Sequence, residues 1–173
     1  MEITMDRYRQ LTKLATTQSG QHSNEAPSDV VCAVAALVGD RDVEASYIRY
    51  TPNGKSTEWF GLWIIGGGLA HVSVTYREQQ WTAIRERDQS RGRYSKPTQV
   101  CSWYRSLDSI DRLTYGQVQG YPTGTEESFK LSGDVTLHFR DSSTPITLGY
   151  GPAHQDSADE LLLKLRDWVG QQR

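Results

Sequence analysis

Cysteine is scarce in this chain, which has only Cys32 and Cys101 among its 173 residues. The two lie far apart in the sequence and match no C-x-x-C pair and no zinc-ligand spacing. Cys32 also lies in an apolar run, so we expect both cysteines to be reduced and to serve as packing residues. Their spacing therefore predicts no metal centre.

A large excess of charge of one sign is missing as well. The formal net charge is −2 at pH 7, and the isoelectric point is close to 6.1. Because this balance creates no global basic field, we do not expect nucleic acid as a general partner. Hydrophobic residues make up 36% of the chain, which is polar for a globular protein but short of a disordered composition.

A long hydrophobic run is also absent. The longest apolar stretch, residues 30–38, is far shorter than the ~20 residues that cross a bilayer. The first ten residues contain no apolar leader segment. We therefore expect a soluble, cytoplasmic protein with no membrane span. The length fits one domain, in which residues 1–29 form an N-terminal helix and polar linker and residues 30–173 form a β domain.

Signatures of known enzyme chemistry are missing too. The triplet Gly54-Lys55-Ser56 resembles part of a phosphate loop, but Arg49 stands where such a loop needs a further glycine. The glycines at residues 66–68 have no dinucleotide-binding spacing around them, so we expect a turn. The histidines show no metal-ligand spacing; they are His22, His71, His138 and His154. We therefore assign no catalytic residue, metal or cofactor.

The N-terminal part of the chain carries helical patterns. Apolar residues at helical spacing predict a helix over residues 5–18, and a polar linker follows over residues 18–29. Residues 30–38 are rich in alanine and valine and are followed by Gly39, which favours a short buried helix. A strand over residues 30–38 remains an open alternative, because valine suits both states.

From residue 43 the period of the pattern changes to two, which predicts strands. Residues 58–65 are apolar on both faces and should form the most buried, central strand. The segment 69–76 alternates apolar residues with His71, Ser73 and Thr75, which is typical of a half-exposed strand. Further strands are predicted over residues 43–50, 81–87, 100–105, 128–131, 135–139 and 146–150, with a weaker candidate over residues 115–118. Between the later strands we expect turns at residues 132–134 and 141–145.

The chain ends in an amphipathic pattern. Ser157 and Glu160 have the spacing of a capping box, and Leu161, Leu165 and Trp168 follow on one face. We therefore expect a structural helix that buries these side chains. The fold class predicted from these elements is α+β: an antiparallel barrel or sandwich of about seven strands, closed by a C-terminal amphipathic helix and preceded by an N-terminal helical extension.

This order of elements resembles the pleckstrin-homology-like superfold over about residues 43–169. Two stretches are similar to segments of its members: residues 59–73, with the strand–turn–strand pattern, and residues 106–113. The resemblance implies that the final helix plugs an open end of the barrel, and that the module binds peptides or proteins. Phosphoinositide binding is not expected, because Lys55 has no Arg-x-Arg after it on the next strand.

One segment concentrates positive charge beside aromatic residues. Residues 77–96 contain six basic and three acidic side chains, and arginines next to aromatic rings can bind anionic groups or stack on bases. The alternative is a solvated loop. The candidate binding residues in this segment are Trp81, Arg85, Arg87, Arg91, Arg93, Tyr94 and Lys96.

Three functions fit these patterns. The leading hypothesis is a binding or adaptor module, not an enzyme, that engages a protein or peptide partner. The alternative is an enzyme or small-ligand carrier with a pocket lined by His71 or His138, and a cavity of several hundred Å³ with titratable groups would favour it. A weaker alternative is contact between the arginine-rich segment and an anionic surface or nucleic acid. The sequence leaves the oligomeric state open.

Overall fold

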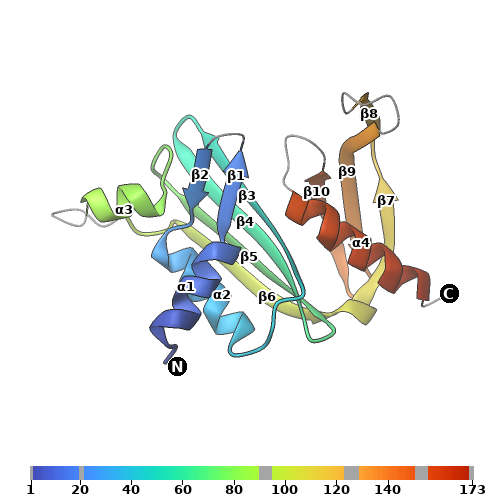
Figure 1. Cartoon of the computed structure of the whole chain (residues 1–173), viewed down its shortest axis with the longest axis horizontal. Helices are drawn as coiled ribbons and strands as arrows, with labels where there is room; N and C mark the ends of the chain where they lie inside the picture. The colour runs from blue at the N-terminus through green and yellow to red at the C-terminus, as the bar shows by residue number, and fades with distance from the viewer. Residues whose placement is uncertain (1, 20–21, 90–94, 123–128, 151–155, 172–173) are drawn as a thin grey trace. The chain divides into compact units, whose positions relative to one another are not determined.

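The computed structural model describes residues 2–19, 22–89, 95–122, 129–150 and 156–171. The chain divides into two compact units, Met1–Tyr104 (unit 1) and Arg105–Arg173 (unit 2). This division differs from the predicted boundary after residue 29. Helices and antiparallel sheets build both units, which confirms the α+β class (Figure 1). Among the described residues no sheet closes into a barrel.

Unit 1 is a four-stranded sheet with helices and a short hairpin. Its elements are α1 (Met5–Leu14), β1 (Thr16–Ser19), β2 (His22–Glu25), α2 (Ser28–Val38), β3 (Ala45–Asn53), β4 (Ser56–Ile65), β5 (Gly68–Tyr76), α3 (Ala83–Gln89) and β6 (Gln99–Ser106). The sheet order is β3-β4-β5-β6, and β1 pairs separately with β2. The predicted polar linker is thus in part a hairpin, because β1 and β2 bond to each other along their length.

The inner strand β4 is the most buried strand of unit 1, as its two apolar faces predict. It pairs antiparallel with β3 on one side and β5 on the other, and residues 59–65 are all buried. Trp59, Trp63 and Ile65 belong to the main core cluster, which also contains Val72 and Val74 of β5. Phe60, Leu62 and Ile64 on the opposite face of the strand are buried as well.

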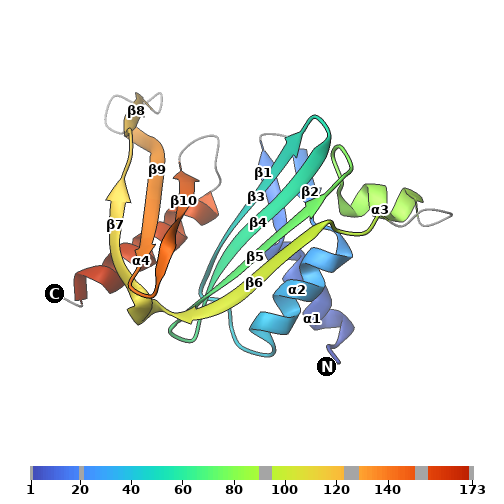
Figure 2. The ribbon, with the colours of Figure 1, turned by 180° about the vertical axis from the view of Figure 1, so that it is seen from behind.

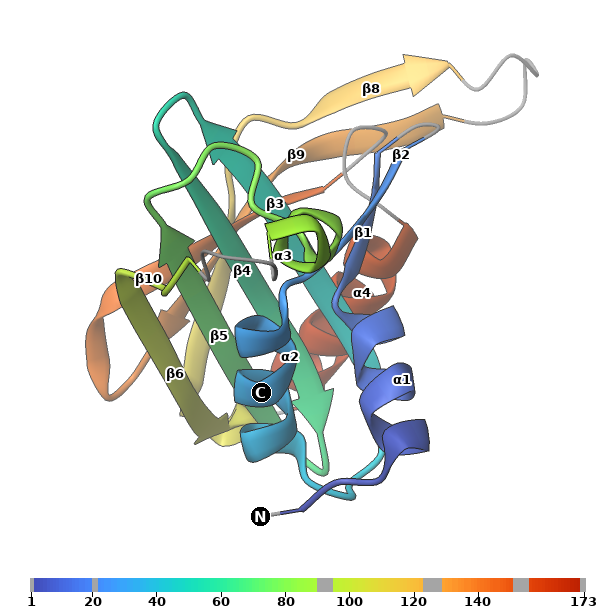
Figure 3. The same cartoon turned by 90° about the vertical axis from the view of Figure 1, so that its left-hand side faces the viewer.

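The segment at residues 30–38 is a helix, which resolves the alternative that the sequence left open. Its buried residues recur at helical spacing and include Val30, Val34 and Val38. The helix ends at Gly39, whose φ of +57° lies in the left-handed region that glycine adopts easily. Figure 3 shows α2 lying along β5 with α1 beside it, and α2 contacts both of these elements.

The helix α1 is part of the core of unit 1. Leu11 and Ala15 are fully buried within the cluster formed by α2 and the sheet. Arg7 ties α1 to the end of α2, because its Nε donates to the carbonyl oxygen of Gly39 at 3.0 Å and its Nη2 donates to that of Arg41. A cation at a helix C-terminus also interacts favourably with the helix dipole. The N-terminal segment therefore packs as an integral element and not as an extension.

Unit 2 is a smaller sheet with one helix. Its elements are a 3₁₀ turn (Leu107–Ser109), β7 (Ile110–Tyr115), β8 (Gln119–Pro122), β9 (Phe129–Phe139), β10 (Ser142–Tyr150) and α4 (Asp156–Gln171). The order is β10-β9-β7, and β8 pairs with the first part of β9 (Figure 2). The predicted turn at residues 132–134 is wrong, because these residues continue β9 and bond to β8 and β10. Pairing with β8 on one side and β10 on the other outweighs the turn propensity of the Ser-Gly-Asp sequence.

The helix α4 covers the apolar face of this sheet. It contacts β7 and β10, and its buried residues Leu161, Leu162 and Leu165 are matched by buried Leu137 and Leu148 on the strands. The C-terminal amphipathic helix is thus confirmed, although it lies along a sheet face and plugs no closed barrel in the described part of the chain. Trp168 is only half-buried, although its indole nitrogen is shielded from solvent, so the prediction that it is a core residue holds in part. The side chain of Ser157 in the predicted capping box lies outside the described residues.

Candidate functional site

The arginine-rich segment is the first candidate site, and the structure separates its members. Arg91, Arg93 and Tyr94 lie outside the described residues. Arg85, Arg87 and Lys96 are exposed, whereas Trp81 is only 1% exposed. The predicted strand over residues 81–87 is wrong, because the helix α3 begins at Ala83. Most residues of α3 are good helix formers, and its charged side chains have no period of two.

Trp81 anchors the segment to the core and is not available to a ligand. Its backbone N–H donates to the hydroxyl of Thr57 at 2.9 Å, and its carbonyl accepts the indole N–H of Trp59 at 2.8 Å. The fully buried Thr57 hydroxyl also donates to the carbonyl of Glu78 at 2.6 Å. Buried polar groups that are satisfied in this way hold a segment in one conformation. Trp81 is therefore a structural residue.

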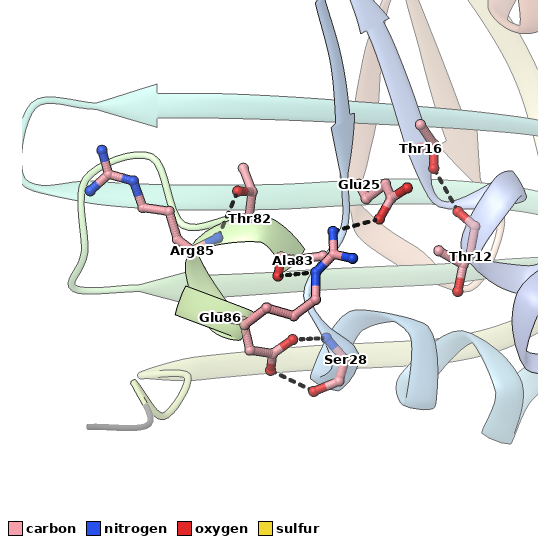
Figure 4. A network of polar contacts seen from close by, with 9 residues as sticks. Thr12, Thr16, Glu25, Ser28, Thr82, Ala83, Arg85 and Glu86 are labelled. Carbon is pink, nitrogen blue, oxygen red and sulfur yellow. Dashed lines mark hydrogen bonds and ion pairs between the residues drawn. The ribbon is translucent and has the colours of Figure 1, made fainter. Parts of the chain in front are cut away.

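The charges of α3 are also used inside unit 1. Glu86 accepts the backbone N–H of Ser28 at 2.8 Å and its hydroxyl at 2.5 Å, as Figure 4 shows. The N-cap residue of α2 is Pro27, which offers no side-chain cap, so this distant carboxylate caps the helix. Arg87 pairs with Glu25 of β2 at 3.4 Å. In the same view Arg85 points away from these pairs, so Arg85 and Arg87 do not form a single binding site.

Two further predictions about reactive side chains are corrected. Cys32 and Cys101 are both exposed and not packed in the interior. Although the Cys32 side chain is exposed, the surrounding protein partly desolvates its thiol, and this desolvation, followed by the Asp29 and Glu86 carboxylates, raises the pKa of the thiol and disfavours the thiolate. His71 is 5% exposed, with its ring 4.9 Å from those of Phe60 and Trp103. It is therefore a core histidine and not one on a solvated strand face.

The second candidate site is the polar face of unit 2. Along β9 the side chains alternate, so that Val135 and Leu137 are buried while Thr136 and His138 face away from that core. The Thr136 hydroxyl lies 3.0 Å from that of Thr147 on β10. On the other side, the Nε2 atom of His138 lies 2.9 Å from the Thr114 hydroxyl of β7. A row of hydroxyl and imidazole groups thus crosses three strands.

A cleft lies at one end of this polar face. Its volume is about 490 Å³, and residues from the start of β7, the end of β9 and the start of β10 line it. The register of β10 against β9 shifts between Ser142 and Ile146, and that of β7 shifts between Ile110 and Arg112. Such bulges redirect side chains at a sheet end. The lining residues are Asp111, Arg112, His138, Phe139, Arg140, Ser142, Ser143 and Pro145.

The chemistry of this cleft, which we name the unit 2 cleft, suits an anionic group. Two guanidinium groups, from Arg112 and Arg140, line it with two serine hydroxyls, and Asp111 is its single acidic residue. Guanidinium groups present planar pairs of donors that match carboxylate and phosphate oxygens. Arg112 also contacts the Asp111 carboxylate at 3.4 Å. On an exposed surface that pair is weak, and a ligand oxygen can compete for the guanidinium.

Sequence reasoning named His138 as a possible pocket residue but missed both arginines. The sequence did contain a pattern that indicates this polar face, because Thr136, His138 and Arg140 alternate with the apolar residues of the strand. What the sequence could not supply is the pairing of Arg112 with His138 across β7 and β9. The other histidine proposed for such a pocket, His71, belongs to the sheet of unit 1.

The described residues contain no group of three or more potential metal ligands. Within the same part of the chain, no helix has the length and apolar character that a bilayer crossing requires. No protein-family model, curated protein or solved structure gives a significant match to this chain.

Proposed function

We propose that this protein is a binding module and that its unit 2 cleft takes an anionic group of a protein or peptide partner. The observation that carries the proposal is the donor set of the cleft: two arginines, a histidine and two serines around about 490 Å³. A carboxylate or phosphate on an extended segment fits such a set, because several charge-assisted hydrogen bonds can form at once. The neighbouring polar face would then contact the rest of the segment.

The proposed fold is the pleckstrin-homology-like superfold that the sequence resembles. The seven strands β3–β7, β9 and β10, followed by the amphipathic helix α4, support it by their order in the chain. Peptide and protein binding is what that resemblance implies. The donor-rich cleft adds a specific place on unit 2 where a charged group of the partner would bind.

A second candidate function is a carrier or enzyme that acts on a small anionic molecule. The cleft volume and the approach of His138 to the Thr114 hydroxyl favour it, because a histidine beside a hydroxyl can accept or donate a proton. The weaker alternative, contact of the arginine-rich segment with nucleic acid or another anionic surface, is less favoured. Trp81 is buried, so its ring is not available to stack on a base.

The test is binding of three probes to the full chain by isothermal titration calorimetry: an acidic phosphopeptide library, the same library without phosphate, and inorganic phosphate. We expect the acidic peptides to bind, and the Arg112→Gln and Arg140→Gln variants to bind at least about ten-fold more weakly, as for the loss of a charged hydrogen bond. The matched control is Arg166→Gln, which removes an exposed arginine of α4 outside the cleft.

The outcomes separate the candidates. Binding of inorganic phosphate with an affinity equal to that of the peptides would favour a small-ligand site over a peptide site. Equal weakening by Arg166→Gln and Arg112→Gln would show general charge attraction and would contradict a role for the cleft. Peptide binding that none of the three variants changes would place the binding surface elsewhere.

A further inference from the structure

The outer strand β6 differs from the other strands at the edges of the two larger sheets. An edge strand exposes unpaired backbone N–H and C=O groups, and proteins usually protect such edges with proline, charge, bulges or a covering element. β3 contains Pro52 and is contacted by β1. β10 contains Pro145 and a register shift, and β7 has a register shift beside Arg112.

The part of β6 that belongs to unit 1, residues 99–104, contains neither proline nor a charged residue. Its sequence, Gln-Val-Cys-Ser-Trp-Tyr, has no charge, proline or glycine and is rich in strand formers. β6 is the last strand in the order β3-β4-β5-β6, and within the described residues no strand pairs with its outer side. Val100 is 54% exposed and Tyr104 is 40% exposed. This is the composition that favours addition of another strand.

The strand itself is held firmly in place. The Tyr104 ring lies over Gly68 of β5, where a side chain would collide with it. The Tyr104 hydroxyl donates to the carbonyl of Ile65 at 3.1 Å, and the Arg41 guanidinium lies 4.7 Å from the centre of the Tyr104 ring. An aromatic ring that covers a glycine in this way stabilises strand register. These contacts hold β6 in its register against β5, so its outer edge has a defined position.

We propose that β6 pairs antiparallel with β6 of a second copy of this chain around a two-fold axis, which joins two four-stranded sheets into one. A strand that pairs with its own copy places residues opposite one another symmetrically, so any like charges close to the axis would repel. The absence of charge from residues 99–104 suits self-pairing. An edge selective for a foreign peptide would gain specificity from charge, which this edge lacks.

The exposed side chains also fix the register. With Ser102 on the two-fold axis, Val100 of one copy lies opposite Tyr104 of the other, and this pairing repeats on both sides of the axis. Pairs of a β-branched and an aromatic residue are among the more favourable cross-strand neighbours. Cys101 of each copy then lies close to the axis. Because a single pair of short strands buries little area, the dimer should be weak and concentration-dependent.

The first test uses charge at the axis. Analytical ultracentrifugation of the full chain at high micromolar concentration should show dimers. Ser102→Lys should weaken dimerisation at least about ten-fold, because the two lysines face each other. Ser102→Glu should do the same, and an equimolar mixture of the two variants should dimerise again. The matched control is Ile84→Lys, a charge added at an exposed site on α3 that should leave the dimer unchanged.

The second test uses Cys101 as a reporter of the axis. In a Cys32→Ser background, Cys101 is the only thiol, and a short bis-maleimide should cross-link two chains. The Cys101→Ser variant, which keeps Cys32, should not cross-link. Thermal midpoints equal to that of the unaltered protein show that each variant is folded.

A monomer at every concentration would overturn the proposal. So would a dimer that Ser102→Lys leaves intact, or a failure of the lysine and glutamate variants to dimerise together. A cross-link through Cys32 and not through Cys101 would assign the interface to α2 and would also overturn it.

Discussion

The two units of this protein use their sheets in opposite ways. In unit 1 both faces of the inner strand β4 are buried, and the Trp59 indole and the Thr57 hydroxyl on this strand hold the segment around Trp81. In unit 2 one face of the sheet is buried under α4, while the other presents Thr114, Thr136 and His138 beside a cleft. In this protein the tryptophans of β4 therefore indicate the core of unit 1, whereas the alternating polar residues of β9 indicate the candidate site of unit 2.

The largest expected effect is in the core of unit 1. Trp59→Ala removes a fully buried ring and the donor to the Trp81 carbonyl. We expect the free energy of unfolding to fall by about 3–5 kcal/mol, as for other large-to-small changes in a core. Urea denaturation followed by circular dichroism measures it. A fall of less than about 1 kcal/mol would contradict the central role of β4.

The N-terminal helix should behave as part of the same core. Leu11→Ala should lower the free energy of unfolding by about 2–5 kcal/mol, because Leu11 is fully buried between α1 and its neighbours. Met5→Ala, on the same helix and 65% exposed, is the control and should change it by less than about 0.5 kcal/mol. Equal, small effects of both substitutions would support the predicted N-terminal extension and would contradict a place for α1 in the core.

Unit 2 should be more tolerant of the loss of a large ring. Trp168 is half-buried at the end of α4, so Trp168→Ala should cost about 1–2 kcal/mol, less than the full burial of such a side chain. The comparison with Trp59→Ala is direct, because the chemical change is the same. If urea denaturation gives equal losses for the two variants, the contrast between the units is wrong.

The smallest expected effect concerns the cap of α2. Glu86→Ala removes the acceptor of both bonds from Ser28 and should cost about 1 kcal/mol, as for the loss of an N-cap. Glu86→Gln keeps an acceptor oxygen and should cost less. Thermal unfolding compares the two. A glutamine variant as unstable as the alanine variant would show that charge, and not hydrogen bonding, makes the contribution.

Much of the local structure was predictable. The alanine-rich composition of residues 30–38 and the glycine after them favoured a helix at α2 but left a strand open, and the two apolar faces of residues 58–65 predicted that β4 is an inner strand. The last helix follows from its leucine spacing. Segments with mixed signals were predicted wrongly: residues 132–134 read as a turn but continue β9, and residues 81–87 read as a strand but lead into α3. At residues 132–134 pairing with β8 and β10 outweighs the local turn propensity, whereas in α3 the helix propensity of residues 83–89 itself favours the helix.

The sequence by itself determined which residues are apolar and how they are spaced, and this spacing was enough to predict α2, β4 and α4. Only the tertiary structure decided the roles of single side chains. Trp81 became an anchor because Thr57 and Trp59 of β4 bond to its backbone, and Glu86 became a helix cap because it accepts hydrogen bonds from Ser28. Arg112 and His138 share a cleft because β7 pairs with β9. Periodicity acts over a few neighbouring residues, whereas these contacts join positions that only the folded chain brings within hydrogen-bonding distance.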